Sequence, residues 1–242
     1  IKYTMRRPDV NGRELRVGGG LSFPHDGETG HSYRFGMNLP IVEGAFALRA
    51  SFARNSLPGY VDNLVDGRED INAAEQTSAR VALRWEGEGT SLQFAAMRQE
   101  VDSRNNSVIA LDPDTYRPLS GLSNRIHVDE PFRKEIDHFS FTVEHELGFA
   151  DLVSSTSYAD SHTANRGDVS LSYGEYPLAF LDADPTLEPG SAYIDNRLGL
   201  SQFTQELRLQ SRSGGRLEWL VGGFYSNEDG DNYQYVALNR LD

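Results

Sequence analysis

The sequence predicts an all-β fold, an antiparallel meander of about nine strands of the kind that forms a transmembrane β-barrel. Three observations predict it. Apolar and polar residues alternate in segments of about ten residues, the length of a tilted membrane-spanning strand. Tight turns and long polar loops follow one another along the chain, and aromatic residues gather at both ends of the segments.

The alternating segments share one property: one face is apolar and the other carries Arg, Ser, Thr and Gly. In the first segment, Leu15 and Val17 face away from Glu14 and Arg16. Helical spacing fits these stretches poorly, and their Gly, Ser, Thr and aromatic content favours strands. The segments lie near residues 15–23, 33–39, 46–52, 79–85, 92–96, 139–143, 152–158, 203–209 and 217–225.

Two kinds of connection join these segments. The tight turns lie at residues 42–45, 86–89, 148–150 and 212–216. The long polar connections lie near residues 54–76, 103–135 and 160–201. Short turns on one side and long loops on the other are the arrangement of outer-membrane barrels, and only the link at 24–30 is short on the long-loop side.

Aromatic residues at the segment ends give an independent indication, because barrels carry aromatic girdles where the apolar band meets the lipid headgroups. Trp85 precedes one tight turn and Trp219 follows another. The apolar face is almost free of charge, as lipid contact requires; Arg98 is expected at a strand end and His145 near a turn. The residues predicted to lie at the membrane interface are Phe23, Tyr33, Phe52, Trp85, Trp219 and Tyr225.

The composition excludes several classes of protein. A net charge of −13 argues against a nucleic-acid partner, and 38% hydrophobic residues are too many for a disordered chain. The absence of cysteine removes disulfides and thiolate metal sites. No run of about 18 apolar residues is present, so a membrane-spanning helix is not expected. The chain opens at Ile1 without a signal peptide, and we expect a processed or truncated start.

A soluble antiparallel barrel or sandwich is the alternative, because one buried and one solvated face produce the same alternation. Alternation alone does not say which face is covered. Long loops on one side only favour the membrane barrel, since long structureless loops are uncommon in compact soluble domains.

Particular motifs resemble one family, the TonB-dependent outer-membrane receptors. The opening run Ile1–Pro8 resembles the last strand of their plug domain, although Thr4 stands one place early. The runs Phe203–Ser211 and Leu217–Tyr225 resemble a mid-barrel hairpin of the family, with its F-x-Q-E-L-R-L-x-S and W-x-x-G-x-F-Y patterns. The stretches Asn38–Val42, Leu48–Ser51 and Gly59–Asn63 resemble its first barrel strands, so the resemblance covers essentially the whole chain.

The resemblance implies that residues 1–9 are the C-terminal end of a plug domain and residues 10–242 the N-terminal portion of a barrel of about 22 strands. It further implies an outer-membrane receptor in a bacterial cell, in contact with outer-membrane lipid. Such a receptor imports a bulky, scarce solute using energy from the TonB complex, which it contacts through a plug segment that this chain lacks. A ferric siderophore is the first candidate; cobalamin, haem and oligosaccharides are alternatives.

No catalytic or metal-binding motif is found, so we expect neither an enzyme nor a cofactor. There is no G-x-S-x-G elbow for a serine nucleophile. His25 and His31 lack the helical spacing of zinc motifs. The acidic runs at 66–70 and 228–231 do not match an EF-hand, and we expect solvated acidic loops there. The glycines at 18–20 lie in a strand without a following helix, which favours close approach of another backbone, such as the plug, over a phosphate site.

The functional residues are expected on the polar face, which points into the lumen of a barrel. There they could hold the plug through ion pairs or meet an anionic solute, although charged residues line any wet barrel interior. The alternative function is a passive porin or another non-transporting barrel such as an adhesin. The candidate residues are Arg16, Arg34, Arg49, Arg80, Arg84, Glu206 and Arg208.

Overall fold

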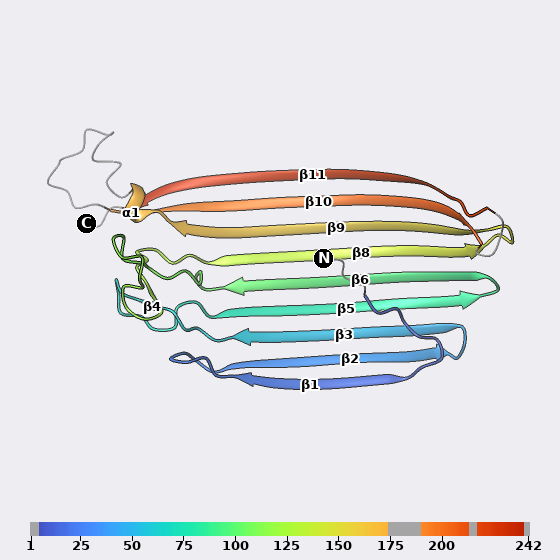
Figure 1. Cartoon of the computed structure of the whole chain (residues 1–242), viewed down its shortest axis with the longest axis horizontal. Helices are drawn as coiled ribbons and strands as arrows, with labels where there is room; N and C mark the ends of the chain where they lie inside the picture. The colour runs from blue at the N-terminus through green and yellow to red at the C-terminus, as the bar shows by residue number, and fades with distance from the viewer. Residues whose placement is uncertain (1–4, 174–189, 213–216, 240–242) are drawn as a thin grey trace.

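The computed structural model describes residues 5–173, 190–212 and 217–239, and one antiparallel sheet dominates it (Figure 1). The nine strands of the sheet follow the order β1-β2-β3-β5-β6-β8-β9-β10-β11, so each pairs with the next long strand along the chain. This order confirms the predicted all-β meander. Among the described residues the sheet is open, with β1 and β11 at its two edges.

The strands of the sheet are β1 (Glu14–Ser22), β2 (Gly30–Val42), β3 (Phe46–Leu57), β5 (Ala74–Gly87), β6 (Thr90–Ser103), β8 (Phe132–Glu146), β9 (Ala150–Asp168), β10 (Ser191–Ser211) and β11 (Leu220–Asn239). Two short strands, β4 (Asp62–Asn63) and β7 (Ser123–Asn124), form a separate parallel pair. In the described ranges the helix α1 (Ser170–Tyr173) is short, and no helix there is long and apolar enough to cross a membrane.

The strands extend well beyond the segments that the sequence predicts. The expected loop at 160–201 is wrong in extent, because β9 continues to Asp168 and β10 begins at Ser191. The acidic run at 228–231 is part of β11 and not a solvated loop. Arg98 likewise lies inside β6 and not at its end. In these extensions apolar residues stand among polar ones on both faces, as Tyr193 and Leu198 do, so the alternation disappears while the backbone hydrogen bonds of the ladder continue.

The two faces of the sheet differ in character, and the register defines them. On the apolar face, Leu83 pairs with Phe94, which pairs with Phe141. Val81, Phe94 and Phe141 are each 42–46% exposed, since no second layer covers this face in the described structure. A soluble sandwich would bury such a face. The described residues thus form a single layer whose apolar face is exposed.

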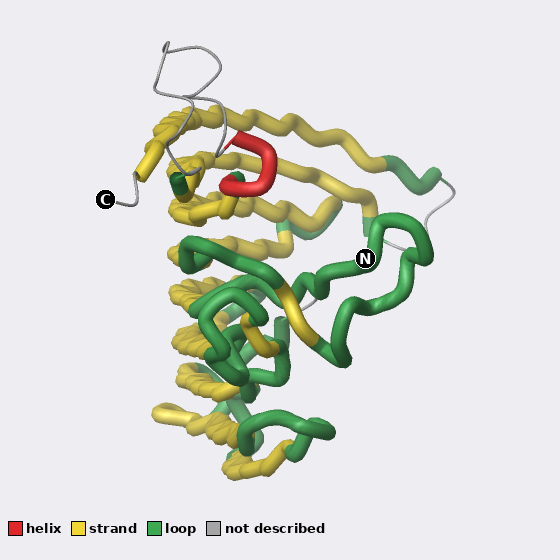
Figure 2. The backbone as a smooth tube through the Cα atoms, turned by 90° about the vertical axis from the view of Figure 1, so that its left-hand side faces the viewer, coloured by secondary structure: helices red, strands yellow, loops and turns green. Residues whose placement is uncertain are grey.

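The opposite, polar face carries the rest of the described chain. The tight turns lie at one end of the sheet, the turn end, and the long connections lie at the other, the loop end (Figure 1). Figure 2 shows that the long connections extend to the side of the sheet on which the N-terminus lies. The N-terminal segment and the long connections therefore lie on the polar-face side of the sheet, and the candidate site is described there.

Candidate functional site

The seven predicted lumen residues all lie on the polar face. Each pairs with a residue of that face: Arg34 with Gly18, Arg84 with Gln93, and Arg208 with Val153, for example. The structure does not bring the seven into one cluster. Arg16 and Arg49 meet at one carboxylate, Glu206 neighbours Arg208, and Arg34 has no acidic partner among the described residues.

Glu14 joins several arginines near the edge of the sheet. Its carboxylate lies 2.8 Å from Nη2 of Arg49 and 3.4 Å from Nη1 of Arg6, and Arg16 is a third partner. Sequence reasoning placed Glu14 on the polar face but did not select it. A lone acid among arginines on the polar face was the available signal.

Asn38 holds the N-terminal segment, residues 5–13, against the sheet. Its side chain is 3% exposed; Oδ1 accepts from the amide of Asp9 at 2.9 Å. Its Nδ2 donates to the carbonyls of Asp9 at 2.8 Å and Gly12 at 2.5 Å. Val10 between them is 4% exposed, and its carbonyl accepts from the Gly44 amide in the β2–β3 turn at 3.0 Å. The segment is therefore fixed at the turn end of β2.

From there the N-terminal segment crosses the polar face toward β8 (Figure 1). Nη1 of Arg80 donates to the carbonyl of Arg6 at 3.3 Å, and Nη1 of Arg7 lies 2.8 Å from Glu144. Contacts thus run from β1 and β2 through β5 to β8. Ile1–Thr4, on which part of the plug resemblance rests, lie outside the described residues.

A hollow of about 540 Å³ lies beside this crossing at the turn end. Arg84 and Arg208 line it together with Glu144 and Asp151. Nε of Arg84 is 2.7 Å from Glu86, but in the part of the chain that is described neither this buried Nε nor that of Arg208 has a hydrogen-bond partner. A guanidinium with a free buried donor can bind a carboxylate or a backbone carbonyl.

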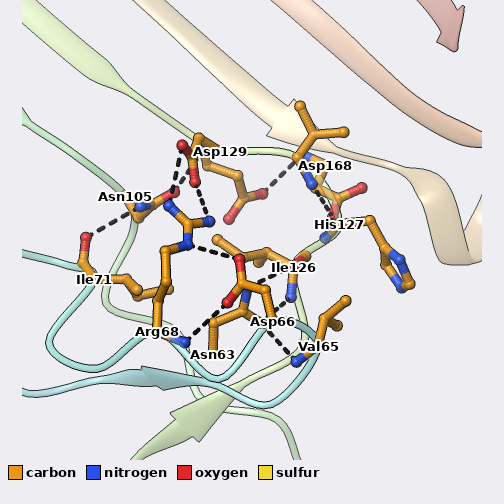
Figure 3. A network of polar contacts seen from close by, with 12 residues as sticks. Asn63, Val65, Asp66, Arg68, Ile71, Asn105, Ile126, His127, Asp129 and Asp168 are labelled. Atoms are coloured by element: carbon orange, nitrogen blue, oxygen red, sulfur yellow. Dashed lines mark hydrogen bonds and ion pairs between the residues drawn. The ribbon is translucent and has the colours of Figure 1, made fainter.

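At the loop end, residues 58–73 and 104–131 fold together into one unit, here called the loop module (Figure 3). Its core is Val61, Ile71 and Ile126. Asn63, 1% exposed, donates to the Ile126 carbonyl at 2.9 Å and accepts from the Ile126 amide at 3.1 Å. Asn105 similarly donates to the Ile71 carbonyl at 3.1 Å. Two loops that are far apart in sequence thus share one buried, hydrogen-bonded core.

An ion pair on the surface of the loop module joins the same two loops. Nη2 of Arg68 lies 2.7 Å from Asp129, and its Nε lies 2.6 Å from Asp66. The hydrogen bonds that Arg68 donates to Asp129 and Asp66 raise the pKa of Arg68, which stays charged. Burial favours the neutral form of Asp66. Hydrogen bonds that the Arg68 backbone amide and guanidinium donate to Asp66 outweigh this effect and hold the pKa of Asp66 below its usual range. The acidic run at 66–70 is an exposed loop, as expected, and in addition Asp66 and Arg68 form ion pairs within the module.

Glu130 and Asp168 join the loop module to the end of β9. The Asp168 amide donates to Glu130 at 2.8 Å, and the Asp168 carboxylate accepts from the Val128 amide at 3.2 Å. Burial raises the pKa of Glu130; the hydrogen bond from Asp168 opposes this shift, and the negative charge of Asp168 reinforces it. Sequence reasoning missed this junction, because nothing local in the sequence marks it.

The predicted interface aromatics lie on the apolar face or at its rim. Trp85 pairs with Phe46 and Leu92 near the β5–β6 turn. Tyr33 and Tyr225 belong to the same face of the sheet, as does Phe52. Phe23 directly follows β1 and Trp219 directly precedes β11, where the Ser211 amide donates to the Trp219 carbonyl at 2.8 Å.

Comparisons with known proteins identify a related fold. No protein-family model matches the chain, and no curated protein sequence does. The structure is similar to that of the ferric yersiniabactin uptake receptor FyuA from Yersinia pestis, with a TM-score of 0.75 and 16% sequence identity. The match covers 96% of this chain and 33% of the receptor, so the chain spans about a third of that receptor's length. At this identity the similarity shows the fold alone: the open, antiparallel sheet of this chain matches a part of that receptor's structure.

Proposed function

We propose that this chain is part of an outer-membrane receptor that imports a bulky, scarce solute with energy from the TonB complex. In this proposal residues 1–9 end a plug domain and residues 10–242 begin the barrel wall. The path of the N-terminal segment supports it most directly. A chain that crosses the polar face before entering β1 is what a plug inside the lumen requires, whereas an open porin has no need of it.

The apolar face supports a membrane location. Its exposed side chains would contact lipid, and the polar face would then line a wet lumen. The loop module would lie at the outer mouth of that lumen, and the tight turns would face the periplasm. A non-transporting barrel would share these features, so they support the location more than the transport.

The polar-face arginines bear on the type of solute. Arg16, Arg49, Arg84 and Arg208 each have a carboxylate of the same face within 4 Å, and Arg80 contacts the N-terminal segment. Ion pairing within the wall and with a plug therefore accounts for most of them. We propose a ferric siderophore as the first candidate solute because FyuA, by its name, takes up ferric yersiniabactin.

Radiolabelled uptake tests the proposal. The complete gene is expressed in a receptor-deleted strain, with and without a functional TonB, and uptake of ferric siderophores is measured beside cobalamin and an oligosaccharide. We expect uptake of a ferric siderophore that disappears without TonB. Uptake that persists without TonB would refute the energised receptor, and TonB-dependent uptake of another solute would refute only the siderophore.

A further inference from the structure

The loop module carries a well-ordered hairpin, residues 108–122, here called the apolar hairpin. The Leu119 amide donates to the Ala110 carbonyl at 3.0 Å, and the Asp112 amide donates to the Arg117 carbonyl at 2.8 Å. Asp112 Oδ1 accepts from the amide of Thr115 at 2.7 Å and from its hydroxyl at 2.8 Å. The Ala110 amide, in turn, donates to the Ser123 carbonyl of β7 at 2.8 Å. These bonds tie the hairpin to the module.

This ordered hairpin exposes large apolar side chains. The ring of Tyr116 is 79% exposed, at the tip. Four others are 41–59% exposed: Val108, Leu111, Leu119 and Leu122. Five exposed large apolar residues within the fifteen residues of one hairpin differ from apolar residues scattered singly over a surface, which need no explanation.

The backbone at Tyr116 is unusual. Its φ is 54°, in the left-handed region that glycine or asparagine adopts with less strain than a tyrosine. A glycine would therefore serve the turn better than the residue that is present. The aromatic ring therefore gives the reason for a tyrosine at this position, and its exposure indicates a contact outside the hairpin.

The position and the charge of the module limit what that contact is. The long connections extend to the polar-face side of the sheet (Figure 2), which faces the lumen in the proposed receptor. The loop module contains eight carboxyl groups and four arginines, and Arg68 already lies between Asp66 and Asp129. An anionic solute is repelled by such a surface, whereas a neutral or cationic one is not.

We infer that the apolar hairpin binds the incoming solute through an aryl or alkyl group, and that this solute is neutral or cationic and not polyanionic. The inference rests on the proposed uptake function and makes it more specific. In this inference Tyr116 is the central contact.

The test uses the complete receptor in detergent and three iron chelates as probes: a trianionic ferric tris-catecholate, a neutral ferric trihydroxamate, and the same trihydroxamate with an attached aryl group. Affinity is measured by isothermal titration calorimetry. We expect the aryl trihydroxamate to bind about tenfold more tightly than the other two. Tightest binding of the trianionic chelate, or no gain from the aryl group, would overturn the inference.

Variants of Tyr116 separate binding from folding. Tyr116→Gly removes the ring and relieves the backbone strain, so the hairpin should keep its amide-exchange protection while the aryl trihydroxamate binds about tenfold more weakly. Tyr116→Phe should bind as the wild type does. Tyr233→Ser, a control on the opposite face in β11, should have no effect. If Tyr116→Gly binds the aryl trihydroxamate as tightly as the wild type does, and uptake by the wild type needs TonB, only the role of the hairpin is overturned. If uptake by the wild type does not need TonB, the proposed function itself is overturned.

Discussion

Replacing Asn38 by alanine should release the N-terminal segment from the barrel wall. The side chain makes three hydrogen bonds to the backbone of Asp9 and Gly12, at 2.5–2.9 Å, in a site where it is 3% exposed. Each bond contributes about 1 kcal/mol net. Val10, buried by the same contacts, contributes about 1.5 kcal/mol or more. In the variant, water replaces part of these hydrogen bonds. We therefore expect the free energy needed to open the N-terminal segment locally to fall by about 2–3 kcal/mol.

Amide exchange measured by mass spectrometry reports this change. A shift of about 2–3 kcal/mol corresponds to exchange about 30- to 150-fold faster. The faster exchange should be confined to peptides that contain residues 9–12 or Gly44, whose amide donates to the Val10 carbonyl, because the register of β2 does not depend on this side chain. Asn55→Ala is the matched control: Asn55 lies on the same polar face in β3 and makes no side-chain hydrogen bond among the described residues.

Two results would refute this reasoning. If Asn38→Ala exchanges no faster at residues 9–12 than Asn55→Ala does, the three hydrogen bonds do not hold the segment. If exchange rises equally throughout β2 and β3, Asn38 supports the sheet as a whole and not the attachment of the N-terminal segment.

Three further changes test other parts of the structure. Asn63→Ala should destabilise the loop module by about 2–3 kcal/mol and speed its proteolysis, whereas Asn124→Ala should not, because among the described residues the Asn124 side chain accepts a hydrogen bond only from the adjacent Arg125 amide. The raised pKa of Glu130 means that its carboxyl group binds a proton more tightly in the folded module than in the unfolded chain. The amide-exchange protection of the module, corrected for the intrinsic exchange rate, should therefore fall as pH rises through the pKa of Glu130. Glu130→Gln should abolish this fall. Gly44→Ala, at a φ of 76°, should lower unfolding free energy in urea by about 1 kcal/mol, while Gly36→Ala, with room for a methyl group, should change it less.

The sheet could be predicted from the sequence because one property repeats at every strand. Wherever one face meets an apolar medium, as at Leu83 and Phe94, the period of two is visible in the residue types themselves. The ends of β9, β10 and β11 could not be predicted in the same way. There the ladder continues with polar and apolar residues mixed on both faces, as in the pairs Asp229–Ser201 and Leu198–Asn232, and local sequence no longer distinguishes strand from loop.

The loop module was not predicted at all, for a related reason. Asn63 meets Ile126 across 63 positions of the chain, and Arg68 meets Asp129 across 61. Such contacts leave no periodic pattern, and an asparagine that satisfies buried backbone groups looks like any loop asparagine. The polar-face arginines, by contrast, followed directly from the alternation, although it could not reveal that Glu14 would pair with Arg16 and Arg49.

The aromatic residues predicted at the membrane interface allow a last geometric argument. A row is here the line of directly paired residues that crosses the sheet from strand to strand. The row that starts at Tyr33 passes through Thr77 and His162 and reaches β11 at Asp231, six residues beyond Tyr225. Six residues span about 20 Å, and seven strand spacings span about 34 Å. A line from Tyr33 to Tyr225 is therefore inclined by about 30° to the row.

The second pair of aromatics gives the same inclination. The row that starts at Trp85 reaches β11 at Gly223, four residues beyond Trp219, after five strand spacings. About 13 Å over about 24 Å is again about 30°, and in the same sense. Two belts that are parallel to each other and oblique to the rows are expected if the strands tilt in a membrane, for which barrels show about 35–45°. A soluble sheet would have no reason to align Tyr33 with Tyr225 and Trp85 with Trp219 at one common angle.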